Sequence, residues 1–458
     1  MKSPLFYVKL AGVSLFILLY FGLVWYWKDH FLPNTYINGY NCSNMTLHEA
    51  NAFLRECMMA YRLDVKGRGG TIIGSIAIAE LDATMNLAPL LSNLMKQQAN
   101  YAWVDAFWRK SAHQYEGVIQ IERPKLRAMI ESWSACLPEN MQEPRNAVIA
   151  PFSPTEGTYK LIPETQGNLL DLDKVAEVLM QGIARYESEI DLDEQQCYVN
   201  AELTKESQIL RDSLKKLNTW ISTSIKYDWN GQEIIVDADI IREWLQVDEY
   251  NPTIDYGAIL TFVLQTAQEQ DTYGKLRLFV TANGQEKVLP GGIFGWRTDV
   301  DAETNALIQS IEKGEHSIRE PIYLHRGVVK GKEDIGSTYI EIDLTNQHLY
   351  QFEEGNLVFE TDFVSGNMSN GSATPEGVFG LTYKTRDAIL RGENYETPVQ
   401  YWMPFNGNIG MHDATWRSEF GQTIYQTAGS HGCINLPLEA AQKIYESIST
   451  GHPIICYY

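Results

Sequence analysis

The residues best suited to chemistry in this chain of 458 residues gather in one stretch near its C-terminal end. The stretch is IGMHDATWRSEFGQTIYQTAGSHGCINLP, residues 409–437, and it contains His412, Asp413, Ser430, His431, Cys433 and Asn435. A cysteine attacks as its thiolate, and a neighbouring imidazole can accept the thiol proton. This set of residues therefore predicts nucleophilic catalysis by Cys433 with a histidine as the base.

The residues around Cys433 predict how the nucleophile is positioned. Pro437 is a favourable first residue of a helix, and apolar residues follow it at helical spacing: Leu438, Ala441, Ile444, Tyr445 and Ile448. We therefore expect Cys433 just ahead of a helix N-terminus, whose partial positive charge would lower the pKa of the thiol. Gly432 permits close approach of a substrate carbonyl, and the backbone amides of residues 432–434 could form an oxyanion hole.

Three other roles for Cys433 stay open at this point. His412, His431 and Cys433 could bind zinc, although no fourth ligand stands at the usual spacing. Cys433 could instead form a disulfide with Cys456, or it could be an inert core cysteine. The polar residues on both sides of Cys433 argue against a dry core.

The hexapeptide SHGCIN at 430–435, preceded by His412, resembles the signature of the L,D-transpeptidase catalytic domain, the YkuD-type domain. That signature has a histidine, two further residues, a gap, and then Ser/Thr-His-Gly-Cys-hydrophobic-Asn. Other family-like pieces come before it in the family's order: LYQFEEGNLVFETDFVSG, ATPEGVF and VQYWMPF. The resemblance extends over residues 337–458, where alternation of apolar and polar residues independently predicts short strands.

The resemblance implies a mostly-β sandwich or partly closed barrel, with Cys433 in a groove under a loop lid. The lid is expected near residues 384–400, which include Arg386, Arg391 and Gly392. Neither a metal nor an organic cofactor is expected. Carbapenem-type inhibitors are expected to acylate Cys433.

The resemblance also implies a mechanism. Cys433 would attack the carbonyl of the third residue of a peptidoglycan tetrapeptide stem, expel the terminal D-alanine and form a thioester. His412 would act as general base and then general acid, oriented by Asp413 or its backbone carbonyl. A side-chain amine of another stem would then complete a 3→3 cross-link. The remaining site residues would shape the nucleophile's surroundings and the oxyanion hole: Ser430, His431, Gly432 and Asn435.

The N-terminal segment predicts a membrane anchor. Residues 10–27, LAGVSLFILLYFGLVWYW, carry no charge, and as a helix they would be about 27 Å long, close to the hydrocarbon thickness of a bilayer. Lys2 and Lys9 precede the segment, so the positive-inside rule puts the N-terminus in the cytoplasm and the residues after the anchor outside the cell membrane. Residues 1–30 would then form the cytoplasmic tail and the transmembrane anchor. A cleaved signal peptide and a buried core helix are the alternatives.

The middle region, residues 31–330, is expected to be an extracytoplasmic α+β region. A capping box of Thr46 and Glu49 predicts a helix near 46–61, and apolar spacing predicts another after Asp171. The stretch 157–183 can be set beside 292–311, because each has a strand after glycine, an acidic helix start and an amphipathic helix. We therefore consider a repeat.

Residues 146–183 resemble the peptidoglycan-binding domain found upstream of some bacterial L,D-transpeptidases, through PRNAVIAPF, YKLIPE, Gly167 and the helix after Asp171. The alternative is a spacer between membrane and catalytic domain. Four aromatic residues could stack on sugars, although such clusters more often belong to a core: Tyr101, Trp103, Phe107 and Trp108.

Charge and cysteine content restrict the remaining possibilities. The chain has 37 Lys and Arg against 58 Asp and Glu, a formal net charge of −21, which argues against nucleic acid as a partner. Six cysteines are too few for a disulfide scaffold, and pairing among the others stays open: Cys42, Cys57, Cys136, Cys197 and Cys456. The alternatives to a transpeptidase are an L,D-carboxypeptidase using the same residues and an inactive wall-binding scaffold.

Overall fold

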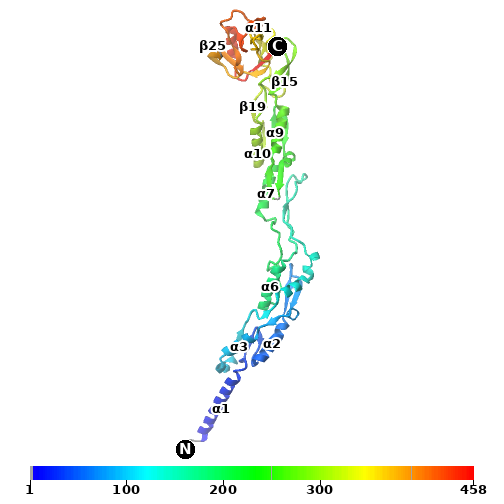
Figure 1. Ribbon diagram of the computed structural model, residues 1–458, viewed down its shortest axis with the longest axis vertical. Helices are drawn as coiled ribbons and strands as arrows, with labels where there is room; N and C mark the ends of the chain where they lie inside the picture. Colours follow the sequence, from blue (N-terminus) through cyan, green and yellow to red (C-terminus); the bar gives the residue numbers. More distant parts are fainter. Residues whose placement is uncertain (1–3, 249, 393–394) are drawn as a thin grey trace. The chain divides into compact units, whose positions relative to one another are not determined.

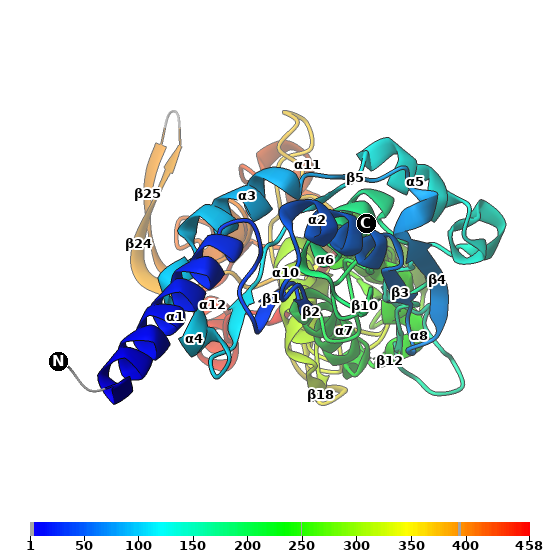
Figure 2. The ribbon, with the colours of Figure 1, turned by 90° about the horizontal axis from the view of Figure 1, so that it is seen from below.

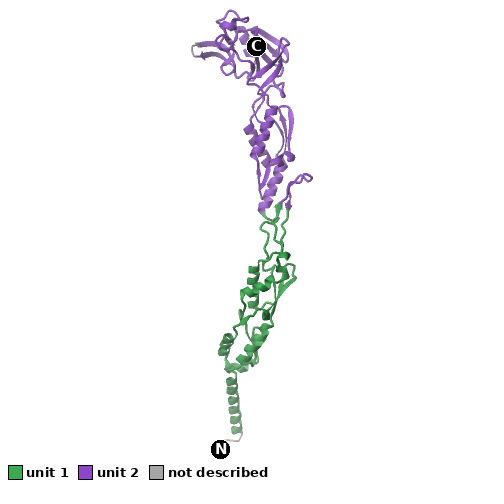
Figure 3. Cartoon of the chain, turned by 45° about the vertical axis from the view of Figure 1, so that its right-hand side comes forward, with its two compact units in different colours: residues 1–148, 162–207 green, residues 149–161, 208–458 purple. Residues whose placement is uncertain are grey.

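The computed structural model describes residues 4–248, 250–392 and 395–458. The chain forms two compact units (Figures 1 and 3). Unit 1 comprises residues 1–148 and 162–207, and unit 2 comprises residues 149–161 and 208–458. Each unit is described by itself below.

Unit 1 starts with the long apolar helix α1, Pro4–Tyr26. Within it, Tyr7–Tyr26 is long and apolar enough to cross a membrane, a property that a signal sequence shares. The other elements are β1 (Thr35–Ile37), β2 (Tyr40–Asn41), α2 (Leu47–Met59), β3 (Arg62–Lys66), β4 (Ile72–Ala77), β5 (Thr84–Met85), α3 (Ala88–Gln97), α4 (Trp103–Ala106), β6 (Ser111–His113), β7 (Ile119–Gln120), α5 (Arg123–Glu131), α6 (Leu172–Arg185) and β10 (Glu189–Asp191). Two of the three boundaries between the units fall within β8 (Val148–Ile149) and β9 (Leu161–Ile162), and the third lies between Ser207 and Gln208.

Two helices of unit 1, α2 and α6, begin where the sequence predicts. Thr46 accepts the backbone N–H of Glu49 and Glu49 reaches back to Thr46, which completes the capping box of α2. Asp171 caps α6 by accepting the N–H groups of Asp173 and Lys174. Beside these helices, β3 pairs antiparallel with β4 and parallel with β10, giving the strand order β10-β3-β4.

Unit 2 contains a second α+β region before the catalytic domain. Its elements are α7 (Gln208–Ile221), β11 (Ser224–Trp229), β12 (Gln232–Val236), α8 (Ala238–Ile241), β13 (Leu245–Asp248), β14 (Asn251–Ile254), α9 (Tyr256–Gln270), β15 (Gly274–Val280), β16 (Glu286–Gly291), β17 (Arg297–Thr298), α10 (Val300–Lys313), β18 (His316–Arg319) and β19 (Tyr323–His325). Here β11 pairs antiparallel with β12 and parallel with β18, and Asp299 caps α10. The α+β composition expected for the middle region is therefore confirmed.

The last part of unit 2, from residue 337, is rich in strands. Its elements are β20 (Tyr339–Asp343), β21 (His348–Glu353), β22 (Asn356–Asp362), β23 (Gly377–Gly380), β24 (Thr385–Gly392), β25 (Tyr395–Asn406), β26 (Ile409–Asp413), α11 (Ile424–Ala428), β27 (Ile434–Leu436), α12 (Leu438–Ser447) and β28 (Pro453–Tyr457). One sheet has the order β22-β21-β20-β28-β23 and the other β24-β25-β26-β27. Apolar side chains of both sheets and of α12 form one core, so the mostly-β expectation is confirmed.

The hairpin β15–β16 belongs to the α+β region but packs against the catalytic domain. Phe279 and Leu289 share a core with Val378 and Tyr457. Arg277, on β15 itself, is also buried and forms an ion pair with buried Asp334 at 2.8 Å. Carbonyl groups accept the remaining guanidinium hydrogens of Arg277, which compensates for burying the charges. The region before residue 337 is therefore joined to the catalytic domain by a packed contact.

Candidate active site

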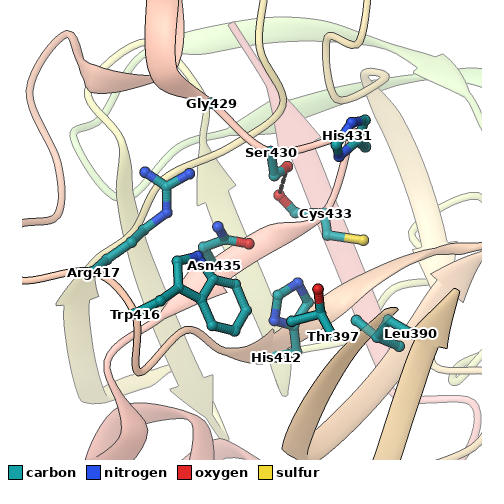
Figure 4. A pocket seen from close by; sticks show the side chains of 10 residues that line it. All are labelled: Leu390, Thr397, His412, Trp416, Arg417, Gly429, Ser430, His431, Cys433 and Asn435. Atoms are coloured by element: carbon teal, nitrogen blue, oxygen red, sulfur yellow. Dashed lines mark hydrogen bonds between the residues drawn. The ribbon is translucent and has the colours of Figure 1, made fainter. Parts of the chain in front are cut away.

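Two neighbouring parallel strands hold the predicted site residues. His412 lies on β26 directly opposite Asn435 on β27, and Cys433 precedes β27 by one residue. Together with Ser430 and His431 they line a cavity of about 220 Å³, which Figure 4 shows. Five further residues complete its lining: Leu390, Thr397, Trp416, Arg417 and Gly429. The fold thus joins residues that lie apart in the sequence.

His412 is buried and has a defined orientation. Its Nδ1 lies 2.9 Å from the backbone carbonyl oxygen of Asp413. A carbonyl only accepts, so Nδ1 must be the protonated nitrogen and Nε2 keeps its lone pair. Burial lowers the pKa of the imidazole below its ordinary value, which favours the neutral form.

The carboxylate of Asp413 has a different task from its carbonyl. Its Oδ1 accepts the backbone N–H of Tyr401 at 2.8 Å and so ties β26 to β25. Of the two expectations for Asp413, the geometry fits the backbone carbonyl as the group that orients His412. The rings of Trp402 and Trp416, which the sequence analysis did not select, have their centroids 5.9 Å from that of His412.

Cys433 is half-buried at the cavity wall. Its thiol donates to the carbonyl oxygen of Asn408, 3.6 Å from Sγ. Burial raises the pKa of the Cys433 thiol to about 11, and a hydrogen bond from the backbone of Gly410 acts in the opposite direction. At neutral pH, Cys433 and His412 therefore form a neutral thiol and imidazole rather than an ion pair.

The expectation of a helix N-terminus next to Cys433 is wrong. Strand β27 follows Cys433, and α12 starts only at Leu438, with Pro437 as its N-cap instead of its first residue. Because the field of a helix end falls off within one turn, it does not offset the burial of the thiol. The apolar residues after Pro437 predicted the helix correctly but not the intervening strand.

Ser430 and Gly432 hold the turn before the nucleophile. The Ser430 hydroxyl donates to the Cys433 carbonyl at 2.5 Å and accepts the N–H of Gly432 at 3.0 Å. The Gly432 N–H is thus already engaged, contrary to the expectation that it would face an oxyanion. Among the described residues, none accepts a hydrogen bond from the Cys433 N–H.

A threonine that the sequence analysis did not select, Thr374, stabilises this turn through hydrogen bonds. Thr374 donates its hydroxyl proton to the Gly432 carbonyl at 2.8 Å and accepts the Gly366 N–H at 3.0 Å. Thr374 lies within the stretch ATPEGVF. The sequence analysis recognised this stretch as similar to the family but did not predict the hydrogen bonds of Thr374. Gly432 itself has φ +117°, and a Cβ there would lie 3.2 Å from Ile409 Cδ1.

Asn435 and His431 occupy different depths of the cavity. Asn435 is buried, and its backbone N–H and carbonyl both pair with Val364. Its side-chain Oδ1 is buried without a hydrogen-bond partner in the described chain. His431 is exposed at the rim (Figure 4).

Arg417 places a positive charge at one side of the cavity. The guanidinium donates to the Ala428 carbonyl at 2.9 Å, and no ion pair for it occurs within the described ranges. Burial lowers the pKa of Arg417. Arg417 lies in the gap between His412 and the SHGCIN stretch, and the sequence analysis assigned no role to the residues of that gap.

The hairpin β24–β25 lies where the lid was expected, with Leu390 and Thr397 at the cavity. Arg391 pairs with Glu396 at 2.9 Å, and Arg386 donates to the Tyr401 hydroxyl at 3.3 Å. The lid prediction covered residues 384–400, of which 393–394 lie outside the described residues.

The other roles considered for Cys433 find no support in this geometry. No group of three or more His, Cys, Asp or Glu side chains suited to a metal occurs in the part of the chain that the structure describes. Cys433 and Cys456 are both free, which contradicts a disulfide between them. An inert core cysteine is also wrong, because Cys433 lines the cavity.

Comparison with known families defines the class of this domain. Residues 337–456 match the model of the YkuD family, described as "L,D-transpeptidase catalytic domain". Residues 206–319 match the family described as "Putative peptidoglycan binding domain". This second match lies downstream of residues 146–183, where the sequence analysis located its resemblance, and it includes the stretch 292–311.

Individual relatives agree. The chain is 26% identical over 120 residues to the Bacillus subtilis protein named "Putative L,D-transpeptidase YciB", a match that covers 24% of this chain and 60% of that protein. The chain thus spans less than two thirds of that relative. A solved Enterococcus faecium L,D-transpeptidase mutant is 31% identical, covering 54% of this chain and 100% of that one, with a TM-score of 0.45.

The catalytic domain of the E. faecium enzyme, solved by NMR, is 41% identical over 26% of this chain and 96% of that one, with a TM-score of 0.25. A further structure presents that domain acylated by ertapenem. By these sequence identities and the family match, the chain belongs to the L,D-transpeptidase family.

Proposed function

We propose that this protein is a membrane-anchored peptidoglycan L,D-transpeptidase that forms 3→3 cross-links through a cysteine thioester. The observation that carries the proposal is the pairing of an accessible cysteine with a buried, neutral histidine in one cavity. The Nδ1–H of His412 is bound to the Asp413 carbonyl, which leaves Nε2 as the base.

In the acylation step, Cys433 Sγ forms a bond to the carbonyl carbon of the third stem residue while its proton moves to His412 Nε2. Collapse of the tetrahedral intermediate breaks the C–N bond, and His412 returns the proton to the departing D-alanine amine. The Cys433 N–H is the candidate oxyanion donor, since the Gly432 N–H is bound to Ser430.

In the transfer step, the amine of a second stem attacks the thioester carbonyl and His412 removes a proton from it. The C–S bond then breaks and the proton returns to the sulfur, which restores the neutral thiol. Ser430 and Thr374 position the turn, and His431 lies where a stem enters. Arg417 is the candidate contact for a substrate carboxylate, because its guanidinium reaches the cavity and forms no ion pair with another described residue.

The anchor and the cellular location are part of the proposal. Helix α1 has 20 consecutive residues fit to cross a membrane, and Lys2 lies on its N-terminal side. This arrangement supports a single span with the N-terminus in the cytoplasm and the catalytic domain on the cell-wall side. A cleaved signal peptide is the competing reading, and N-terminal sequencing of the membrane-associated protein separates the two.

We also infer that the middle region holds two peptidoglycan-binding modules. The matched region of unit 2 runs α7, β11, β12, then α10 and β18, with β18 parallel to β11. Unit 1 has the same order in α2, β3, β4, then α6 and β10, with β10 parallel to β3. The shared topology, with an aspartate N-cap on α6 and on α10, supports a repeat.

Mass spectrometry of products from a defined disaccharide-tetrapeptide tests the reaction. Transpeptidation predicts a dimer one D-alanine short of two substrates, whereas an L,D-carboxypeptidase yields only the tripeptide. The Cys433→Ala variant should form neither product. The control is Cys57→Ala, which removes a half-buried thiol from unit 1 and should leave activity unchanged. Activity retained in Cys433→Ala would overturn the assignment of the nucleophile.

A further inference from the structure

Three of the four aromatic residues in 100–108 are exposed and do not belong to a core, whereas Trp103 is half-buried. Tyr101 is 70% exposed, Phe107 is 53% exposed and Trp108 is 79% exposed. Val104, on the short helix α4 between them, is also exposed. We name these four residues the aromatic platform. Leaving such large apolar side chains in water is unfavourable, so a platform of this kind indicates a partner that covers it.

Helix α4 lies beside α1 in Figure 2, and the turn of residues 100–102 that precedes α4 contacts α1. The Tyr20 hydroxyl donates to the Tyr101 carbonyl at 2.6 Å, and the Tyr20 ring lies 6.0 Å from that of Trp103. Half-buried Leu23 and Val24 and buried Trp27 continue the same face of α1. The last two turns of α1 are therefore covered on one face by folded protein.

No flexible linker separates α1 from this segment. The side-chain Nε2 of Gln98 donates to the backbone carbonyls of Trp27 and His30 at 2.7 and 2.8 Å. The side-chain Oε1 of Gln98 accepts the backbone N–H of Leu32. These bonds connect the end of the helix to the start of the platform segment. The position of α1 in a bilayer would thus determine the position of the platform.

The depth of the platform follows from helix geometry. Tyr7–Tyr26 would extend about 30 Å, the thickness of the hydrocarbon core. Tyr20 is six residues before the end of this segment, which corresponds to about 9 Å. A segment bonded to Tyr20 therefore lies within about 9 Å of the outer end of the span. It is thus close to the interfacial layer, where Trp and Tyr side chains are most stable.

We propose that the aromatic platform inserts into the outer interface of the lipid bilayer and forms a second membrane contact beside the anchor. The inference rests on the proposed anchoring by α1. Exposed Lys96, Arg109 and Lys110 flank the platform and suit anionic headgroups. Two contacts restrict the tilt of unit 1 at the membrane, which one helix alone does not.

Glycan strands are the other conceivable occupant, because aromatic rings also stack on sugars. The contact with α1 favours lipid, because the exposed rings lie next to a helix whose own apolar side chains are exposed. The two occupants differ in what protects the platform, and the experiment below distinguishes them.

The test uses the full-length protein in lipid nanodiscs that contain a photoreactive phospholipid, followed by peptide mapping. We expect label on α1 and on a peptide containing residues 101–108. The double variant Phe107→Ser, Trp108→Ser should lose most of the label on that peptide, at least several-fold, while α1 stays labelled. The matched control is Ile318→Ser, which removes a 78% exposed apolar side chain from β18 in unit 2 and should change neither.

Label on α1 without label on 101–108 would overturn the platform and leave the anchor intact. Label on neither would refute the anchor and the platform together. Protection of 101–108 by soluble glycan fragments, with no lipid label there, would assign the surface to the wall instead. Cross-linking of soluble stems should be unchanged in the double variant, which verifies that the protein is folded.

Discussion

His412 and Asp413 are adjacent on β26, and the imidazole of the first donates to the backbone carbonyl of the second at 2.9 Å. The Asp413 side chain faces β25 and accepts the Tyr401 N–H. The group that orients His412 is therefore a main-chain oxygen, which no side-chain substitution removes.

This relationship predicts unequal effects of two neighbouring substitutions. Asp413→Asn keeps the backbone carbonyl and an oxygen that can accept from Tyr401, so kcat should fall by less than about 10-fold. His412→Gln removes the base and should lower kcat by about 10²- to 10⁴-fold. Single-turnover acylation measured by mass spectrometry checks both. A loss in Asp413→Asn as large as that in His412→Gln would mean that the carboxylate takes part directly.

The pH dependence of Cys433 alkylation should report a neutral resting pair. Because burial raises the pKa of the thiol to about 11, the thiolate fraction grows with pH up to that value. Alkylation of Cys433 by iodoacetamide should accelerate from pH 7 towards pH 11 without a plateau at neutral pH. Cys433→Ser provides the background from the other cysteines. A plateau between pH 6 and 8 would indicate a preformed thiolate–imidazolium pair.

Acid should destabilise the catalytic domain through a half-buried histidine that is not part of the site. Burial lowers the pKa of His452 from 6.5 to about 4. Between these values the unfolded chain binds a proton that the folded chain does not, so stability is present above pH 6.5 and is lost as the pH falls towards 4. The loss is on the order of 2 kcal/mol after allowance for partial exposure.

Thermal unfolding at pH 7, 5.5 and 4.5 measures this effect. The fall in midpoint for the transition of the catalytic domain should be smaller in His452→Gln than in the wild type. An equal fall in both proteins would assign the acid sensitivity to other groups, of which His412 is the next candidate because burial also lowers its pKa.

Gly432 should tolerate no side chain. An alanine there would need φ +117°, which strains the turn that carries Cys433, and its Cβ would lie 3.2 Å from Ile409 Cδ1. We expect Gly432→Ala to lower kcat/KM by about 100-fold or more, since a misplacement of about 1 Å has that effect. Gly355→Ala is the control, because φ is +78° there but nothing lies within 4 Å. It should lose stability and keep activity.

Arg417 should contribute to substrate binding through charge. Arg417→Gln is expected to raise KM by roughly 10-fold or more for a stem with free carboxylates, because a charged hydrogen bond is lost. With stems amidated at the terminal or at a side-chain carboxylate, one amidation should abolish the difference between variant and wild type. Arg391→Gln, which breaks an exposed pair with Glu396, should behave as the wild type. Equal losses on all stems would indicate a structural role.

The sequence by itself determined which residues are candidates for catalysis and the class of domain. Cys433, His412 and their neighbours have chemistry that follows from residue type, and local pattern predicted the capping box at Thr46 and the helix after Asp171. These features depend on residues within a few positions of one another, so they can be predicted from the local sequence.

Only the tertiary structure decided how those groups are tuned. The depth at which Cys433 is buried, the engagement of the Gly432 N–H by Ser430 and the arrival of Arg417 at the cavity all depend on packing of segments far apart in the chain. The short strand β27 also forms because its backbone pairs with β26 and with Val364. The local sequence pattern does not predict this pairing, since the partners lie elsewhere in the chain. It separates Cys433 from the helix, so the helix end does not offset the burial that raises the thiol pKa.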